Sequence, residues 1–75
     1  MVSKLRVMNY LLVITPFGLL RLIAPFRLVV ISEDHPDLEK GAVIYAERVI
    51  YRREYRILFE VNLEWYEYHH FGLLL

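Results

Sequence analysis

Basic and aromatic side chains are concentrated in one short stretch of the chain, residues 48–56. Its members are Arg48, Tyr51, Arg52, Arg53, Tyr55 and Arg56, with Glu54 among them. Guanidinium groups pair with phosphate and carboxylate oxygens, and tyrosine rings stack on bases. The pattern indicates a surface that contacts a nucleic acid, a protein or a lipid headgroup, or else a hairpin that faces only solvent.

A strand is predicted next to this stretch, over residues 56–63. Its apolar residues occupy every second position, at Ile57, Phe59, Val61 and Leu63. Successive side chains of a strand point to opposite faces, so these four share one face and Glu60 falls on the other. This alternation is typical of a sheet with one buried face and one face in water.

A second strand is predicted over residues 65–70, after a turn at Asn62-Leu63-Glu64. Asn tolerates the left-handed backbone that a tight turn requires. The strand would place Trp65, the only tryptophan, on one face and Tyr66 and Tyr68 on the other. So many aromatic residues form either a wall of the core or a platform on which a ligand stacks.

The residue types that bind metals are present, but their spacing does not indicate a site. They are His35, His69, His70, Glu33, Asp34, Asp37 and Glu39. Adjacent histidines on a strand point to opposite faces, and the acidic residues lack the spacing of a calcium loop. The chain has no cysteine, no glycine-rich phosphate loop and no nucleophile motif. We therefore expect a protein that is not an enzyme and has no metal or cofactor.

Length and composition indicate one small domain that needs additional stabilisation. The chain has 75 residues, of which 57% are hydrophobic, and it has no cysteine to form a disulfide. A domain of this size buries only about 60% of its unfolded surface. Heavy apolar packing, a partner subunit or a membrane would supply what the small core lacks.

The net charge is zero, but the two parts of the chain differ in sign. Residues 1–32 contain four basic residues and no acidic residue. Residues 33–75 contain nine acidic residues against five basic ones. This asymmetry indicates different neighbours for the two parts. Zero net charge also argues against a nucleic-acid binder, which usually carries a basic field.

The first 25 residues are predicted to form an apolar helical segment. Leucines recur at helical spacing, and Thr15-Pro16 has the pattern of a helix start, so the predicted helices cover residues 4–14 and 16–24. They would pack on the remainder of the chain or on a second copy. Alternatively, residues 7–24 approach the ~20 apolar residues of a membrane span, although Asn9, Pro16 and Gly18 weaken this alternative. A secretory signal has little support, because no small-residue cleavage site follows.

Residues 26–75 contain the remaining predicted strands. A near-continuous apolar run over residues 26–32 predicts a strand that is buried on both faces. An acidic loop follows and ends at Gly41, and a strand is predicted over residues 42–50, in which Glu47 and Arg48 indicate a bend or a solvent-exposed end. Residues 73–75 are predicted to form a short last strand or an exposed apolar tail.

The order of these signals is similar to that of a known group of proteins. The matching residues are Leu38, Gly41, Ile44, Tyr45, Trp65, Tyr66 and Phe71. With them, residues 26–75 resemble small bacterial and bacteriophage proteins with a Src-homology-3-like (SH3-like) β-barrel. The resemblance implies a fold and a regulatory or host-interacting role, and it implies no particular chemistry, because such barrels serve many functions.

The predicted fold is therefore mainly β with short N-terminal helices. It consists of an apolar helical segment, residues 1–25, and a small SH3-like barrel of four or five antiparallel strands, residues 26–75.

The predicted function is non-enzymatic binding of a protein partner, in the cytoplasm, with self-association through the apolar N-terminal segment. The predicted binding residues are Tyr51, Arg52, Arg53, Tyr55, Trp65, Tyr66 and Tyr68, because aromatic residues and Arg dominate binding energy at interfaces. Two alternatives remain. One is a membrane-anchored accessory subunit with residues 7–24 in the bilayer, and the other is a nucleic-acid-binding barrel that uses the basic hairpin 48–56.

Overall fold

The structure, a computed structural model, describes residues 6–33, 35–52 and 56–75. These residues form nine strands and one short 3₁₀ helix, so the predicted mainly β class is confirmed. The strands are β1 (Arg6–Met8), β2 (Tyr10–Thr15), β3 (Gly18–Ile23), β4 (Phe26–Val30), β5 (Val43–Ala46), β6 (Arg48–Arg52), β7 (Arg56–Val61), β8 (Glu64–Glu67) and β9 (Phe71–Leu73). The helix, η2 (Tyr68–His70), connects β8 to β9.

The described strands form three open sheets. One sheet has the order β1-β6-β7-β8, a second has the order β5-β4-β9, and β2 pairs only with β3. The chain passes from the second sheet to the first at Glu47, whose amide donates a hydrogen bond to the Glu60 carbonyl at 2.8 Å. The predicted bend at this position is confirmed. The predicted closed barrel of four or five strands is wrong, because each of these sheets has two edge strands and none closes on itself.

The core lies between the two larger sheets and receives residues from both. Its buried side chains are Leu11, Phe26, Leu28, Val30, Ala46, Val49, Phe59, Val61 and Phe71. Along β4, Phe26, Leu28 and Val30 are buried, whereas Arg27 is exposed and Val29 is half-buried. The prediction that this strand is buried on both faces is therefore wrong, since only alternate side chains reach the core.

The predicted N-terminal helices are also wrong, because residues 10–23 form the β2–β3 hairpin. Tyr10 to Thr15 pairs residue by residue with Gly18 to Ile23. The turn is stabilised by Thr15, whose hydroxyl donates to the Gly18 carbonyl at 2.9 Å and accepts from the Phe17 amide at 3.2 Å. Gly18 has a φ of +123°, which other residues rarely adopt. The polar Thr15 therefore closes a turn instead of capping a helix.

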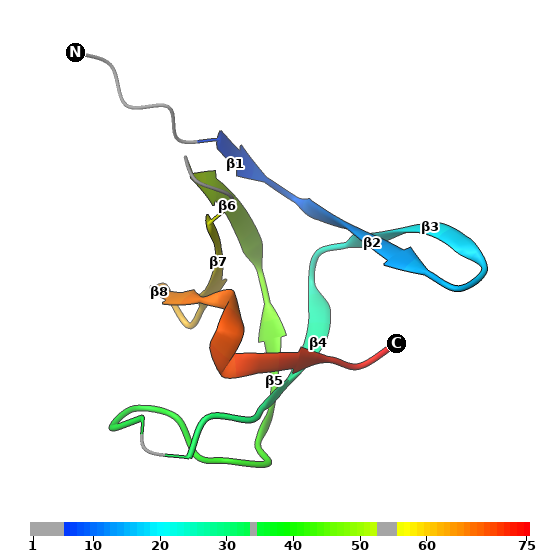
Figure 1. Ribbon diagram of the computed structural model, residues 1–75. Helices are drawn as coiled ribbons and strands as arrows, with labels where there is room; N and C mark the ends of the chain where they lie inside the picture. The colour runs from blue at the N-terminus through cyan, green and yellow to red at the C-terminus, as the bar shows by residue number, and fades with distance from the viewer. Residues whose placement is uncertain (1–5, 34, 53–55) are drawn as a thin grey trace.

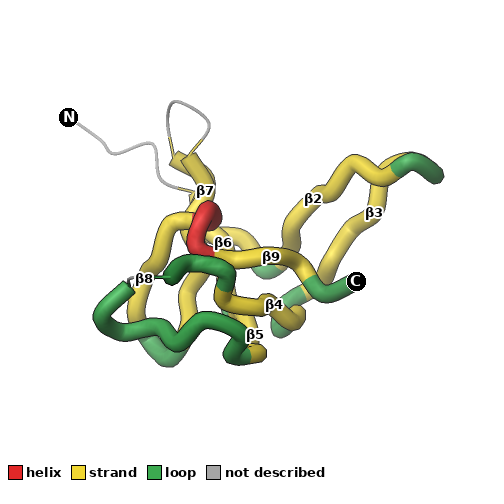
Figure 2. Tube along the Cα trace, turned by 60° about the horizontal axis from the view of Figure 1, so that its bottom comes forward, coloured by secondary structure: helices red, strands yellow, loops and turns green. Residues whose placement is uncertain are grey.

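The hairpin extends away from the two larger sheets as an arm (Figure 1, Figure 2). β1 precedes it and pairs with β6, at the edge of the four-stranded sheet. Only the base of the arm reaches the core, through Leu11. We refer to residues 10–23 below as the arm and to the two larger sheets as the body.

The turn between β7 and β8 follows the sequence prediction more closely. Asn62 and Leu63 both have positive φ, 50° and 66°, and they connect the strands as a two-residue hairpin loop. The prediction that Leu63 shares the buried face of the strand is wrong, because β7 ends at Val61 and Leu63 is 83% exposed in the turn. The predicted strand over residues 65–70 is only partly correct, because β8 ends at Glu67. Tyr68, His69 and His70 form η2 instead, so strand alternation does not place their side chains.

Candidate binding surfaces

The structure does not bring the seven predicted binding residues together on one surface. Arg52 and Trp65 line the same surface depression, on the outer face of the four-stranded sheet. Tyr51 and Tyr66 lie on the opposite face of that sheet and pack against the core, where burial raises the pKa of Tyr66. Tyr68 lies in η2 and lines a separate groove. Arg53 and Tyr55 lie outside the described residues.

We call the outer face of this sheet the tryptophan face; its residues are Arg48, Ile50, Arg52, Arg56, Leu58, Glu60, Trp65 and Glu67. Strand register places Arg48, Glu60 and Trp65 side by side in one row across three strands. The Arg48 guanidinium donates two hydrogen bonds to the Glu60 carboxylate, at 2.7 and 2.6 Å. The same guanidinium lies 5.7 Å from the centre of the Trp65 ring. Arg48 therefore holds Glu60 and Trp65 in a fixed arrangement.

Glu60 is the only buried charged residue in the described part of the chain, with 5% of its surface exposed. A carboxylate in this position requires a partner, because burial disfavours the charged form. The hydrogen bonds from Arg48 supply that partner and lower the pKa of the Glu60 carboxyl. Arg48 is thus paired with Glu60, although 52% of its side chain is exposed. This pairing offsets the charge that Arg48 would present to a phosphate.

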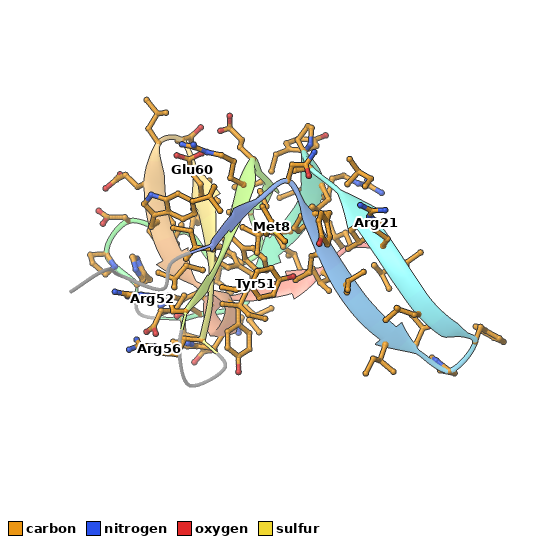
Figure 3. The ribbon with its side chains drawn as sticks, turned by 90° about the horizontal axis from the view of Figure 1, so that it is seen from above. Met8, Arg21, Tyr51, Arg52, Arg56 and Glu60 are labelled. Atoms are coloured by element: carbon orange, nitrogen blue, oxygen red, sulfur yellow. The ribbon has the colours of Figure 1, made fainter. Side chains whose placement is uncertain are left out.

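A second ion pair lies at the other end of the tryptophan face. The Arg56 guanidinium donates to the Glu67 carboxylate, which lowers the pKa of Glu67. Arg52 lies opposite Arg56 in the strand register, is exposed, and makes no ion pair with another described residue. Figure 3 shows Arg52 and Arg56 near each other at one end of the sheet, away from Glu60. The basic stretch found in the sequence is therefore partly neutralised.

Ile50, Arg52, Leu58 and Trp65 enclose a shallow depression of about 270 Å³ on this face. Ile50, Leu58 and Trp65 make most of its lining apolar, and Arg52 contributes a charged side chain. Such a site accepts an apolar side chain beside a negatively charged group. The site is smaller than the ~300–1,000 Å³ typical of small-molecule pockets, so it favours a side chain of a partner protein.

The arm exposes apolar side chains on both of its faces. Leu11 is buried, and Val13 and Leu22 pack against the core cluster near the base of the arm. The exposed apolar residues are Leu12, Ile14, Phe17, Leu19, Leu20 and Ile23. Ile14 is 88% exposed and Phe17, at the tip, is 100% exposed. The sequence had indicated an apolar segment here, but its predicted helical form did not identify which side chains face outward.

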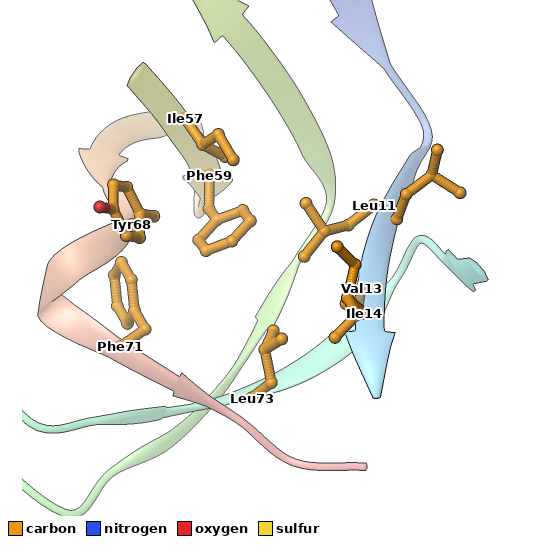
Figure 4. Close-up of a pocket in the computed structure, with 9 residues that line it drawn as sticks. Leu11, Val13, Ile14, Ile57, Phe59, Tyr68, Phe71 and Leu73 are labelled. Carbon is orange, nitrogen blue, oxygen red and sulfur yellow. The ribbon is translucent and has the colours of Figure 1, made fainter. Parts of the chain in front are cut away.

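An apolar groove lies between the arm and the body (Figure 4). It has a volume of about 410 Å³. The arm contributes residues 11–14, and the body contributes Ile57, Phe59, Tyr68, Phe71 and Leu73. Phe59 and Phe71 belong to the core, so the groove is an opening through which the edge of the core meets solvent. None of the described residues that line it has a charged side chain.

Three histidines cluster beside η2. The rings of His35 and His70 lie 4.8 Å apart, those of His69 and His70 lie 4.2 Å apart, and His70 Nδ1 lies 3.1 Å from the Ser32 hydroxyl. Burial, with the nearby His69 and His35, lowers the pKa of His70 and favours its neutral ring. Among residues 6–33, 35–52 and 56–75, no group of three His, Asp or Glu residues is arranged to hold a metal ion.

Comparison with known proteins adds no family to this description. No protein-family model matches the chain, and neither a curated protein nor a solved structure matches it. Within the part of the chain that the structure describes, no helix is long and apolar enough to cross a membrane. The arguments about function therefore rest on the arm, the groove and the tryptophan face.

Proposed function

We propose that this chain is a non-enzymatic binding protein that acts through protein–protein contacts and associates with itself through the arm. The observation that carries the proposal is the exposure of six large apolar side chains on one fourteen-residue hairpin. Scattered exposed apolar residues are normal on protein surfaces, but a contiguous group of this size usually marks an interaction site.

The size of this apolar surface fits a protein interface. The six residues are between 38% and 100% exposed. A stable interface buries about 800 Å² on each partner. Six large apolar residues on one hairpin thus supply a substantial part of one side of such an interface.

A small core gives a second reason for association. Nine buried apolar residues form the core of the described chain, and one end of it opens into the groove. A domain of this length is marginal when it is alone. Covering the arm and the open end of the core would add the apolar burial that the monomer lacks.

The tryptophan face is a candidate for contact with a different protein. Trp65 and Arg52 lie together there, and these residue types contribute most binding energy at interfaces. A nucleic-acid role for the same face has less support, because Arg48 and Arg56 are paired with Glu60 and Glu67. A regulatory or host-interacting role in a bacterium or phage rests only on the resemblance of residues 26–75 to small SH3-like proteins.

Sedimentation equilibrium of the full chain in buffer without detergent tests the main proposal. The monomer mass is 9.1 kDa, and we expect the wild-type chain to reach a multiple of it as concentration rises. Ile14→Ser and Phe17→Ser should weaken association at least tenfold, because each removes apolar surface from the arm. Leu63→Asn is the control: it removes an 83% exposed leucine far along the chain, at a positive φ that Asn accepts.

Three results would overturn the proposal. One is a chain that stays monomeric at every concentration. Another is association that Ile14→Ser and Phe17→Ser leave unchanged. Aggregation that only detergent reverses would assign the arm to a lipid surface and would also contradict it.

A further inference from the structure

We infer that the arm of one copy lies in the groove of a second copy, reciprocally, so that two chains form a two-fold dimer. This inference rests on the proposed self-association and specifies its geometry. The contact is reciprocal only about a two-fold axis: the axis that places one arm in the second chain's groove also places the second arm in the first chain's groove. Each dimer would contain the same contact twice.

The groove has the size and chemistry to receive apolar side chains. Its volume of about 410 Å³ lies within the range of pockets that bind ligands. Its described lining residues are all aliphatic or aromatic, and among them only Tyr68 has a polar group in its side chain (Figure 4). A polar or charged occupant would lose its hydrogen bonds to water there without replacement. An apolar occupant would lose none.

The tip of the arm is the part of the chain with matching properties. Ile14, Phe17 and Leu19 are the three most exposed apolar side chains of the arm, and they surround its turn. No acidic residue occurs between residues 10 and 23. The Thr15 hydroxyl donates to the Gly18 carbonyl and accepts from the Phe17 amide, so these groups keep their hydrogen bonds when the turn enters a groove.

Charge gives a small preference for contact of an arm with a body over contact between two arms. The arm carries one charge, that of Arg21, and the rest of the chain has a net charge of −1, because the whole chain is neutral. Arg21 lies 4.5 Å from the Tyr10 ring (Figure 3). Two arms repel each other through their like charges, whereas the body of a second copy attracts the arm.

The groove and the arm are also one continuous apolar surface. Leu12 and Ile14 are exposed residues of the arm and also line the groove of the same chain. A partner arm that enters the groove therefore contacts the body on one side and the resident arm on the other. One docking event covers both of the exposed apolar features of each chain, which is the arrangement that buries most apolar surface.

Cysteine crosslinking tests this geometry directly, because the chain has no cysteine of its own. Pro16→Cys places one thiol at the exposed tip, and Tyr68→Cys places one thiol at the groove rim. The two full-length variants, carrying tags of different size, are mixed and treated with a short bis-maleimide. We expect crosslinked heterodimers in the mixture, and little crosslinking of either variant alone.

Charge insertion at the groove rim provides the second test. Tyr68→Glu should weaken dimerisation at least tenfold, because it places a carboxylate in the apolar contact. Tyr45→Glu is the matched control, since Tyr45 on β5 has a similar exposure, 54% against 50%, and does not line the groove. Far-ultraviolet circular dichroism of both variants shows whether they fold.

The outcomes separate this inference from the function on which it rests. Crosslinking of Pro16→Cys to itself, with association intact and Tyr68→Glu without effect, would overturn docking in the groove and keep self-association through the arm. A wild-type chain that is monomeric by sedimentation would overturn both. Heterodimer crosslinks together with a selective effect of Tyr68→Glu support both.

Discussion

Two residues of β2 provide the sharpest test of the hairpin itself. Leu11 is 5% exposed and belongs to the core, whereas Ile14 is 88% exposed on the arm. Their spacing of three places them on opposite faces of a strand but on one face of a helix. The hairpin therefore predicts very different effects for Leu11→Ala and Ile14→Ala, and the helix expected from sequence predicts similar ones.

The magnitudes follow from burial. Truncation of a buried leucine to alanine costs about 2–5 kcal/mol, because it removes apolar contacts and leaves a cavity. Ile14 loses almost no burial in the monomer, so its truncation costs less than ~1 kcal/mol, mainly through the lower strand propensity of alanine. With an m-value of about 1 kcal/mol/M for a small domain, Leu11→Ala should lower the urea midpoint by roughly 2 M or more.

Urea unfolding followed by the emission of Trp65, the only tryptophan, measures both midpoints. The experiment is performed at two protein concentrations, because association through the arm would add a concentration-dependent contribution for Ile14. At the lower concentration we expect a large shift for Leu11→Ala, up to loss of the folded state, and a small one for Ile14→Ala. Equal shifts for the two variants in dilute solution would refute the hairpin and restore the helical interpretation.

Four further predictions concern the body. Arg48 lowers the pKa of Glu60, so the stability that this carboxylate contributes is present at neutral pH and is lost as pH falls through its folded pKa. In Glu60→Gln, the urea midpoint should therefore decrease less steeply at acidic pH than in the wild-type chain. The pKa of His70 is lowered in the folded chain, so the unfolded chain binds protons more readily as pH falls below the ordinary value of 6.5. The free energy of unfolding should therefore decrease below that pH. His70→Gln should remove this pH dependence from the urea midpoint. Gly41 has a φ of +89°, so Gly41→Ala should cost about 1–2 kcal/mol in urea unfolding, while Lys40→Ala, at an exposed ion pair with Glu33, should leave the midpoint nearly unchanged. A single-stranded oligonucleotide should not quench Trp65 at low salt, because Arg48 is already paired; quenching that falls steeply with salt and is lost in Arg52→Ala would favour the nucleic-acid alternative.

The two candidate binding surfaces differ in whether their side chains already have partners within the chain. On the tryptophan face, ion pairs connect Arg48 to Glu60 and Arg56 to Glu67, and among the described residues Arg52 and Trp65 line the depression without such a pair. The arm and the groove instead present apolar surface with no internal partner in the described chain. Burial of that surface is favourable with any complementary apolar partner, and a second copy supplies one at equal concentration.

Local patterns were enough to identify most of the body. The alternation of Ile57, Phe59 and Val61 predicted β7 with its buried face, because strand geometry fixes which side chains share a face. Asn62 predicted the turn, because few residues accept a positive φ. The break at Glu47 predicted the bend between two sheets.

The arm was not predictable in the same way. Leucines at positions 11, 12, 19, 20 and 22 satisfy a helical spacing and a strand spacing equally well. Pairing of β2 with β3 decided between the two, since it gives the backbone groups on the facing edges of both strands partners that no local pattern reveals.

For the binding residues, the sequence determined which residue types are present and which side chains alternate between the two faces of a strand. The tertiary structure decided which of these side chains come into contact. Alternation alone separates Trp65 from Tyr66, but only packing shows that Tyr66 faces the core and Trp65 faces outward. Arg48 and Glu60 are twelve residues apart, and the register of β6 on β7 places them in contact and neutralises a charge that the sequence had offered to a ligand. The groove combines residues of β2, β7, η2 and β9, so it exists only once distant segments are folded together. Local backbone preferences act over a few residues, whereas contacts of this kind depend on the whole chain.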